Sequence, residues 1–320
     1  MDLDLLAAQL IRALRGERSQ VQLSRWLGYQ SNVITTWENG RRWPTGAELM
    51  RLAARTGVDV PAAWAAFYRA PPAWLGGIDP CRPEGLAQVL ADLRGGLSIG
   101  ALADRTGLSR HAIGRALSGK AELRLPEVLA IIEGCTLRLV DLIDALVDIE
   151  RVPEAARTFA TLAQHREAAY AQPWTQAVLR AMELADYRAL GGHSAAWLGA
   201  RLGLPEDDVA ACVELLRAAG LVRWDGRRWV GAAAAVDTRR DPATSLRLKG
   251  HWAEVGLRRL EQGNPGQFSY NVFCVSDADL ARLRALHRQY FQQLRAIVAE
   301  SQPGERVVVA NVQLFALDEG

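Results

Sequence analysis

The chain has 320 residues, of which 49% are hydrophobic and 23% charged, values that exclude the low-hydrophobicity, high-charge class of disordered chains. Its length predicts more than one domain, each able to bury its own core. The formal net charge is +2, which by itself does not indicate a nucleic-acid-binding protein. All cations except Lys120 and Lys249 are arginines, whose planar guanidinium groups suit phosphates and base edges.

Several classes of protein are not expected from this sequence. No stretch approaches the roughly 18–20 consecutive apolar residues of a membrane span, and the first four residues lack the basic start of a signal peptide. We therefore expect a cytoplasmic protein. The four cysteines stand singly, the five histidines lack metal-ligand spacing, and the common nucleotide-binding and hydrolase motifs are missing. We expect no enzymatic activity, no metal and no cofactor.

Proline and glycine residues divide the chain into segments. Residues 70–83 hold four prolines and two glycines and cannot continue a helix, so a boundary is predicted there. Weaker boundaries are predicted just after residue 150 and within residues 232–243. The resulting units are residues 1–72, 80–150, 151–235 and 240–320.

The first two units are predicted to be copies of one helical module. Gly28, Ile34 and Gly40 recur as Gly107, Ile113 and Gly119, each 79 residues later. A fixed offset of this kind is the mark of a tandem repeat. The first unit carries nine cations against six acids, and residues 80–124 carry seven against four, so each module has a modest cationic excess.

Residues 19–44 of the first module predict two short helices joined by a glycine turn. Ser19 is expected to cap the first helix, Gly28 to end it, and Gln30 or Ser31 to start the second. The segment resembles the Cro-type (XRE) helix-turn-helix family, and the likeness continues through Trp37-Glu38-Asn39-Gly40-Arg41-Arg42 and Pro44.

This resemblance implies that the second helix enters the major groove of double-stranded DNA and meets base edges with its N-terminal part. Asn and Gln can bond adenine with two hydrogen bonds, whereas Ser and Thr discriminate less. Gln20 matches a position that the family uses against phosphate, and Arg41 and Arg42 could also meet the DNA backbone. The other interpretation is that the polar residues only cap a helix and that the arginines only face solvent. The residues expected to face the groove are Gln30, Ser31, Asn32 and Thr36.

Residues 98–120 repeat this pattern, with Ser98 and Ser109 expected to cap the two helices. The outward residues are of types that contact DNA strongly, since Arg pairs with guanine N7 and O6. The module departs from the family at Leu117, where the first module has Glu38. The two open interpretations are DNA contact and a module that docks onto protein. The candidate DNA-binding residues are Arg110, His111, Arg115 and Lys120.

From about residue 85 to residue 320 the chain resembles a bacterial family of regulators in which a helix-turn-helix precedes a C-terminal domain of unknown function. The residues that carry this likeness are Leu117-Ser118-Gly119-Lys120, the helix from Pro126, and Asn311-Val312-Gln313-Leu314-Phe315-Ala316-Leu317. The resemblance implies a role in transcription regulation and supplies no reaction or ligand.

The third unit has the pattern of a winged helix. Two helices, at residues 194–202 and 205–220, precede a hairpin at residues 221–230 with Asp225-Gly226 at its tip. The second of these helices begins with Glu206-Asp207-Asp208, which would repel phosphates, so we expect a structural or dimer-forming role. The alternative is phosphate contact through Arg223, Arg227 and Arg228.

In the last unit we expect a helix over residues 244–262, strands over 268–275 and 306–317, and a crossover helix over 277–300 between them. Such a small sheet could dimerise or enclose an effector. His251, Trp252 and Glu254 are interpreted as one face of an amphipathic helix rather than a catalytic group.

The predicted fold class is therefore mainly α: tandem five-helix-type helix-turn-helix modules, a winged-helix unit and a small α+β C-terminal unit. The leading hypothesis is a sequence-specific, nucleoid-associated transcriptional regulator that binds double-stranded DNA as a homodimer, with the C-terminal half for dimerisation or effector sensing. The alternative is a protein-interaction adaptor or antitoxin-like partner that uses the same folds to dock on protein.

Overall fold

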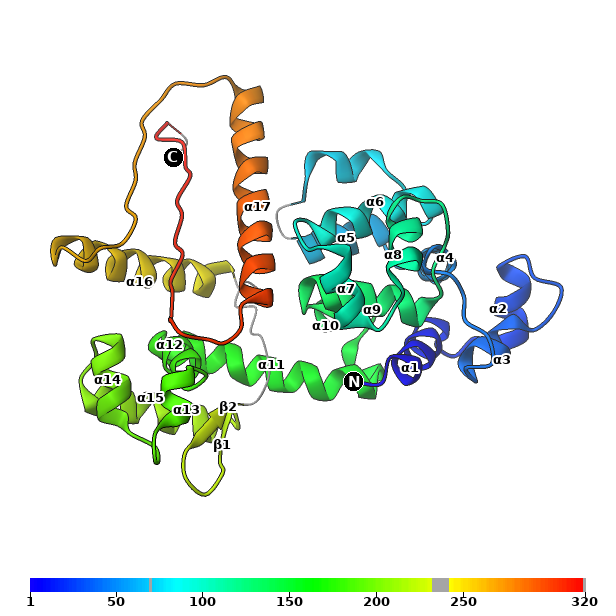
Figure 1. The fold of residues 1–320 in the computed structure, drawn as a ribbon. Coiled ribbons are helices and arrows are strands. Elements are labelled where there is room, and N and C mark those ends of the chain that lie inside the picture. The colour runs from blue at the N-terminus through cyan, green and yellow to red at the C-terminus, as the bar shows by residue number, and fades with distance from the viewer. Residues whose placement is uncertain (69–70, 232–241, 319–320) are drawn as a thin grey trace. The chain divides into compact units, whose positions relative to one another are not determined.

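A computed structural model describes residues 1–68, 71–231 and 242–318, and these residues form a mainly helical protein with one two-stranded sheet (Figure 1). The chain forms two compact units, Met1–Ala160 with Arg288–Glu300, and Thr161–His287 with Ser301–Gly320. The boundary expected within residues 232–243 lies almost wholly outside the described residues. Among the described helices, none has the length and apolar character needed to cross a membrane.

The first unit contains two successive sets of five α-helices, with a short 3₁₀ helix η1 (Ala73–Gly77) between them. Corresponding helices of the two sets start at positions related by the 79-residue offset or within a few residues of it. The first set is α1 (Leu3–Arg15), α2 (Gln20–Trp26), α3 (Val33–Glu38), α4 (Gly46–Arg55) and α5 (Val60–Tyr68). The second is α6 (Pro83–Arg94), α7 (Ile99–Thr106), α8 (Arg110–Leu117), α9 (Leu125–Thr136) and α10 (Leu139–Leu146).

Serine caps and glycine turns explain why both sets break at the same places. Ser19 accepts a hydrogen bond from the Gln22 backbone N–H at the start of α2, and Ser98 accepts from Ala101 at the start of α7. Gly28 and Gly107 both have positive φ, +89° and +71°, at the turns that follow these helices. Since other residues rarely adopt this conformation, glycine is favoured at both turns. The predicted caps Ser19 and Ser98 are confirmed.

The two sets differ in how their second and fourth helices meet. In the second set α7 packs on α9, where Gly134 leaves room for Leu102 and Thr106. The residue of α4 that corresponds to Gly134 is Arg55, which is exposed. A large cation at this position disfavours the close helix approach that glycine permits. The two sets therefore share the order of their helices but differ in how the second helix packs on the fourth.

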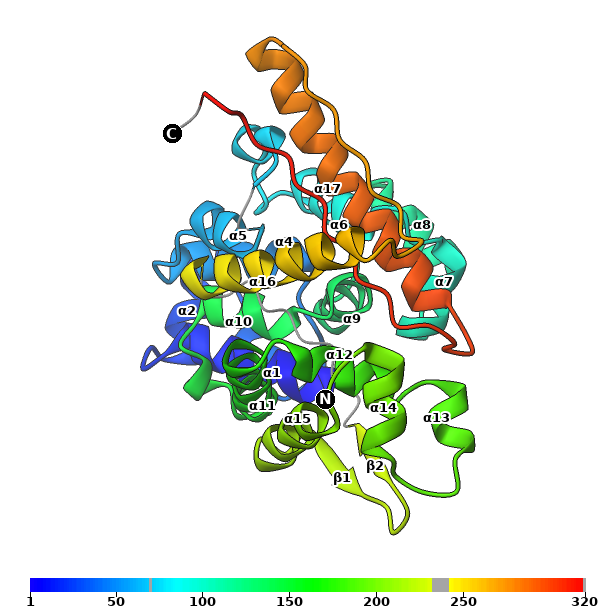
Figure 2. The ribbon, with the colours of Figure 1, turned by 90° about the vertical axis from the view of Figure 1, so that its left-hand side faces the viewer.

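The second unit is built around a buried cluster that includes Val178, Tyr187, Leu198, Val209 and Cys212. A hairpin of β1 (Val222–Trp224) and β2 (Trp229–Gly231) follows α15, and β1 packs against that helix (Figures 1 and 2). The short 3₁₀ helix η2 (Ile149–Arg151) precedes this unit, and α11 (Pro153–Ala171) runs across the boundary into it. The helices that follow are α12 (Trp174–Ala181), α13 (Ala185–Ala189), α14 (Ala195–Leu202), α15 (Glu206–Ala218), α16 (Pro242–Glu261) and α17 (Asp277–Glu300).

The predicted helix over residues 277–300 is confirmed as α17, but the predicted strands beside it are wrong. Residues 268–275 and 306–317 are extended, and the described residues 242–318 contain no β-strand. A strand needs a hydrogen-bonded neighbour, and these two segments do not pair with each other. The expected small α+β unit is therefore helical with two extended segments, in which Tyr270, Val272 and Val308 are at least 80% exposed.

Candidate nucleic-acid interface

Helix α8 presents four of the predicted residues on one surface. Ser109 caps the helix by accepting from the Ala112 N–H, as predicted, and Ile113 and Ala116 are buried on its inner side. The outer side lines an open, shallow depression. The residues around this depression are Arg110, His111, Gly114, Arg115, Ser118 and Lys120.

The turn after α8 fixes Lys120 beside Arg115. The Lys120 N–H donates to the Arg115 carbonyl at 2.8 Å, and Arg115 Nη2 donates back to the Lys120 carbonyl at 3.3 Å. Gly119 between them has a φ of +71°, which allows this tight reversal. The Arg115 guanidinium is thereby held against the Lys120 backbone at the C-terminal end of the helix.

Arg110 lies at the other end of α8, over the start of α7. Its guanidinium passes so close to Gly100 that a Cβ there would lie 3.3 Å from Nη2. The depression is therefore lined by guanidinium groups at both ends, by an ammonium group, and by the imidazole of His111. Such a surface has the donors that phosphate oxygens and guanine N7 and O6 accept from.

In the first set, α3 starts later than predicted. It begins at Val33 with Asn32 as its N-cap, so Gln30 and Ser31 are exposed residues of the preceding turn. Asn32 Oδ1 accepts from the Thr35 N–H at 3.4 Å and lies 3.1 Å from Ser24 Oγ, which itself accepts from the Ile34 N–H. The contact with Ser24 selects Asn32 as the cap, and it leaves the Asn32 amide nitrogen as the group available to an outside partner.

The side chains of Gln20 and Thr36 also form hydrogen bonds within the protein. Gln20 Nε2 donates to Glu38 Oε2 at 2.6 Å, and Gln20 Oε1 accepts from Thr35 Oγ1 at 2.8 Å, so both ends of its amide are engaged. Thr36 Oγ1 donates to the Val33 carbonyl at 2.7 Å. Arg41 and Arg42 follow α3 and are exposed.

Sequence reasoning missed the group of side chains around Glu38, which is 3% exposed. Arg15 Nε donates to Glu38 Oε1 at 2.5 Å, and Arg12 Nη2 donates to the Glu38 backbone carbonyl at 2.6 Å. Together with Gln20 these contacts fasten α3 to α1 and α2. The one signal in the sequence was a glutamate on the same helical face as the apolar residues Ile34 and Trp37.

Tyr29 also holds the turn before α3 in place, through contacts with Glu48 of α4 and Trp37 of α3. Its hydroxyl donates to Glu48 Oε1 at 2.6 Å, and its ring packs edge-on against Trp37 with centroids 5.6 Å apart. Burial and this hydrogen bond raise the pKa of Tyr29 to about 12, so the hydroxyl stays protonated and donating at neutral pH.

In the second unit, the carboxylates of Glu206, Asp207 and Asp208 are exposed in the first turn of α15, as predicted. The hairpin arginines Arg227 and Arg228 point back to the protein. Arg228 Nη2 donates to the Leu190 carbonyl at 2.9 Å and Arg227 Nη2 to the Gly191 carbonyl at 3.1 Å. These bonds anchor the hairpin to the chain between α13 and α14, which favours a structural role.

His251 and Trp252 belong to an aromatic cluster with Trp174, whose ring centroid lies 5.9 Å from that of His251 and 5.2 Å from that of Trp252. Burial lowers the pKa of His251 below its usual value. This packing agrees with the interpretation of residues 251–254 as part of an amphipathic helix. Within the described part of the chain, no cluster of three or more His, Cys, Asp or Glu side chains could hold a metal ion.

Comparison with known families identifies a domain in the C-terminal half of the chain. Residues 145–317 match a domain of unknown function, DUF4423, and because this match spans more than half of the chain, the protein belongs to that family. The match fits the domain of unknown function expected here, and no helix-turn-helix family matches. Neither a curated protein nor a solved structure is significantly similar to the chain.

Proposed function

We propose that this protein is a sequence-specific DNA-binding transcriptional regulator in which α3 and α8 are the recognition helices of two Cro-type helix-turn-helix modules. The observation that supports this most is the depression on α8, lined by Arg110, His111, Arg115 and Lys120, all exposed. Its positive charge complements the phosphates that line the major groove.

The residues around each helix have distinct roles in this proposal. Arg110 and Arg115 contact guanine through paired hydrogen bonds, and the Asn32 amide nitrogen and Gln30 contact base edges from the first module. Arg41, Arg42 and Lys120 contact phosphates, which adds affinity without sequence preference. No catalytic step or cofactor is part of this function, and the site of action is the nucleoid.

The test is a mobility-shift assay of the intact chain against genomic fragments and their shuffled versions at several salt concentrations. Arg115→Ala should cost about 1–3 kcal/mol on the preferred sequence and little on shuffled DNA. Arg41→Ala should weaken binding to all sequences about equally and lower the salt slope by about one.

A matched control is Arg82→Ala, which removes the same charge from the N-cap of α6, at a residue that does not line the depression. Arg82 is 77% exposed and pairs only at 3.6 Å with Asp79, so this variant should bind like the wild type. If the wild-type chain shifts no DNA in a salt-sensitive, sequence-selective manner, the proposal is wrong, and the adaptor function becomes the better hypothesis.

We further propose that the C-terminal half holds two copies of the chain together, with the winged-helix-like part, α14 to β2, in a structural role. The extended residues 268–275 and 306–317 expose apolar side chains, among them Phe315 at 68% and Leu317 at 82%. Extended segments with unpaired backbone groups readily add to another strand. A second copy offers the same segments, and pairing between the two copies would form an intermolecular sheet.

A further inference from the structure

The two modules of the first unit meet at residues that occupy the same position in the repeat. Thr45 and Arg124 are 79 residues apart, and they form an antiparallel β-bridge. The hydrogen bonds beside this bridge are reciprocal. The Gly46 N–H donates to the Leu123 carbonyl at 3.3 Å, and the Leu125 N–H donates to the Pro44 carbonyl at 2.9 Å. Exchanging the modules by the 79-residue offset converts each of these bonds into the other.

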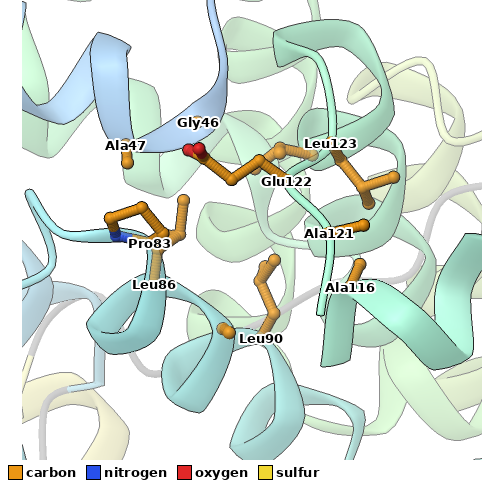
Figure 3. A pocket seen from close by; sticks show the side chains of 11 residues that line it. Gly46, Ala47, Pro83, Leu86, Leu90, Ala116, Ala121, Glu122 and Leu123 are labelled. Carbon is orange, nitrogen blue, oxygen red and sulfur yellow. The ribbon is translucent and has the colours of Figure 1, made fainter. Parts of the chain in front are cut away.

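The helices beside the bridge follow the same relation. Helix α5 packs against α10, its own counterpart, while α1 packs on α9 and α6 packs on α4. The junction is tight, because a Cβ on Gly46 would lie 2.5 Å from Leu86 Cδ2 and 3.0 Å from Val128 Cγ2. Figure 3 looks into the small pocket at this junction, where Gly46 and Ala47 of α4 lie across from Leu86 and Leu90 of α6.

Reciprocal contacts between equivalent residues are the property of a twofold axis. Copies related by translation would use two different surfaces, so residue i of one copy would meet residue j of the other without the reverse contact. The α4–α5 and α9–α10 parts of one chain are therefore arranged like the halves of a symmetric dimer. A protein that reads two half-sites about such an axis binds them in inverted orientation.

The cationic residues after the two candidate recognition helices lie on either side of this axis. Arg41 precedes the bridge residue Thr45 by four positions, and Lys120 precedes Arg124 by four positions. Arg41, Arg42, Lys120 and Arg124 are all exposed, and Glu122 is the acid among them. Both modules thus carry exposed basic residues within four positions of the bridge, and in the proposed complex these residues contact the phosphates between the two half-sites.

The two modules nevertheless present different chemistry at equivalent positions. Ser31 corresponds to Arg110, Asn32 to His111 and Thr36 to Arg115. The neutral side chains of the first module favour adenine or discriminate weakly, whereas the guanidinium groups of the second favour guanine. A symmetric dimer of two chains cannot present two unlike faces about its own axis.

We infer that one chain alone binds an inverted repeat whose two half-sites are unlike, with guanine contacts confined to the half read by α8. This inference rests on the proposed DNA-binding function. A homodimer held together by its C-terminal halves would then bind two such inverted repeats, one with each chain.

The experiment is selection of sites from random double-stranded DNA with the intact chain, followed by a count of chains per selected site by native mass spectrometry. The expected result is an inverted, asymmetric site occupied by one chain per inverted repeat. A perfect palindrome bound by two chains, a direct repeat, or a single half-site would overturn the inference while leaving the DNA-binding function in place. Selection of no site at all would overturn both.

Two variants give an independent readout on the selected DNA. Arg115→Ala should reduce the base preference about tenfold or more in one half only, and Gln30→Ala, at an exposed residue of the first module, should affect only the other half. Arg82→Ala, the control, should leave both halves unchanged. If either variant alters both halves equally, each module contacts both half-sites through two chains, and the inference fails.

Discussion

Asn32 has two roles that a single substitution to alanine would confuse. Its Oδ1 caps α3, and in the proposed function its amide nitrogen contacts a base edge. Loss of an N-cap costs about 1 kcal/mol, so Asn32→Ala would lower both stability and DNA binding. Serine is as good a cap and lacks the amide. We expect Asn32→Ser to keep the thermal unfolding midpoint and to change the base preference at one position. A lower midpoint with unchanged preference would show that capping is the only role of Asn32.

Glu38 is the second residue whose contribution can be measured alone. It is buried and bonded to Arg15 and Gln20, while the second module has Leu117 at the same position. Breaking a buried ion pair by removing one partner costs about 3–5 kcal/mol, because the other charge stays buried and unpaired.

Arg15 is 22% exposed, so solvent screening reduces this figure, and Glu38→Leu should lower the free energy of unfolding by about 2–3 kcal/mol in urea titrations. Glu17→Leu, an exposed site on the same unit, is the control. Equal stability of Glu38→Leu and the wild type would show that apolar packing replaces the ion pair without loss.

Among the helices, those fixed by local signals could be predicted from the sequence. Ser19, Ser98 and Ser109 cap the helices that they were expected to cap, and residues 277–300 form the expected helix. The start of α3 could not be predicted, because three consecutive polar residues can each cap a helix and the choice depends on Ser24, eight residues before Asn32. The exposed face of α8 follows from helical period, whereas the internal bonds of Gln20 depend on tertiary contacts.

The two extended segments, residues 268–275 and 306–317, show that the local pattern of apolar residues is not enough to predict a strand. Their alternating apolar residues have the period of a strand, but a strand also needs a partner. Val307 packs against the core of the second unit, and the neighbouring Val308 is 80% exposed. Phe315 and Leu317, further along the same segment, are also exposed, at 68% and 82%, so the segment leaves most of its apolar surface uncovered.

A pair of variants at these valines tests the proposed dimer. Val308→Asp should leave the thermal unfolding midpoint of the monomer unchanged and convert dimers to monomers in sedimentation velocity, because a charge then faces the second copy. Val307→Asp should instead lower the midpoint, since it places a charge against the core. A Val308→Asp protein that sediments as a dimer would contradict pairing through this segment.

At the scale of the whole molecule, the repeat was visible in the sequence, but the way its copies meet was not. The 79-residue offset is equally compatible with modules joined by translation or by a twofold axis. The distinction rests on the reciprocal bonds around Thr45 and Arg124, which join residues far apart in sequence.

We expect the junction between the modules to contribute both to the stability of the first unit and to the spacing of the proposed half-sites. At Gly46 an added side chain would collide with Leu86 and Val128, which are buried. Overpacking of this kind costs about 1–3 kcal/mol, and part of the strain is relieved by moving the packed elements apart. We expect Gly46→Leu to lower the free energy of unfolding by that amount and to shift the preferred spacing between half-sites in DNA selection.

Gly76 offers a matched control, because no atom lies within 4 Å of the position that its Cβ would take. Gly76→Leu should leave spacing and stability close to those of the wild type. A Gly46→Leu protein that loses stability but keeps the wild-type spacing would show that the junction supports the fold without setting the distance between the recognition helices. Loss of stability together with altered spacing would show that the junction both stabilises the fold and sets the spacing. A dimer interface has the same two effects in proteins whose two DNA-binding domains lie on separate chains.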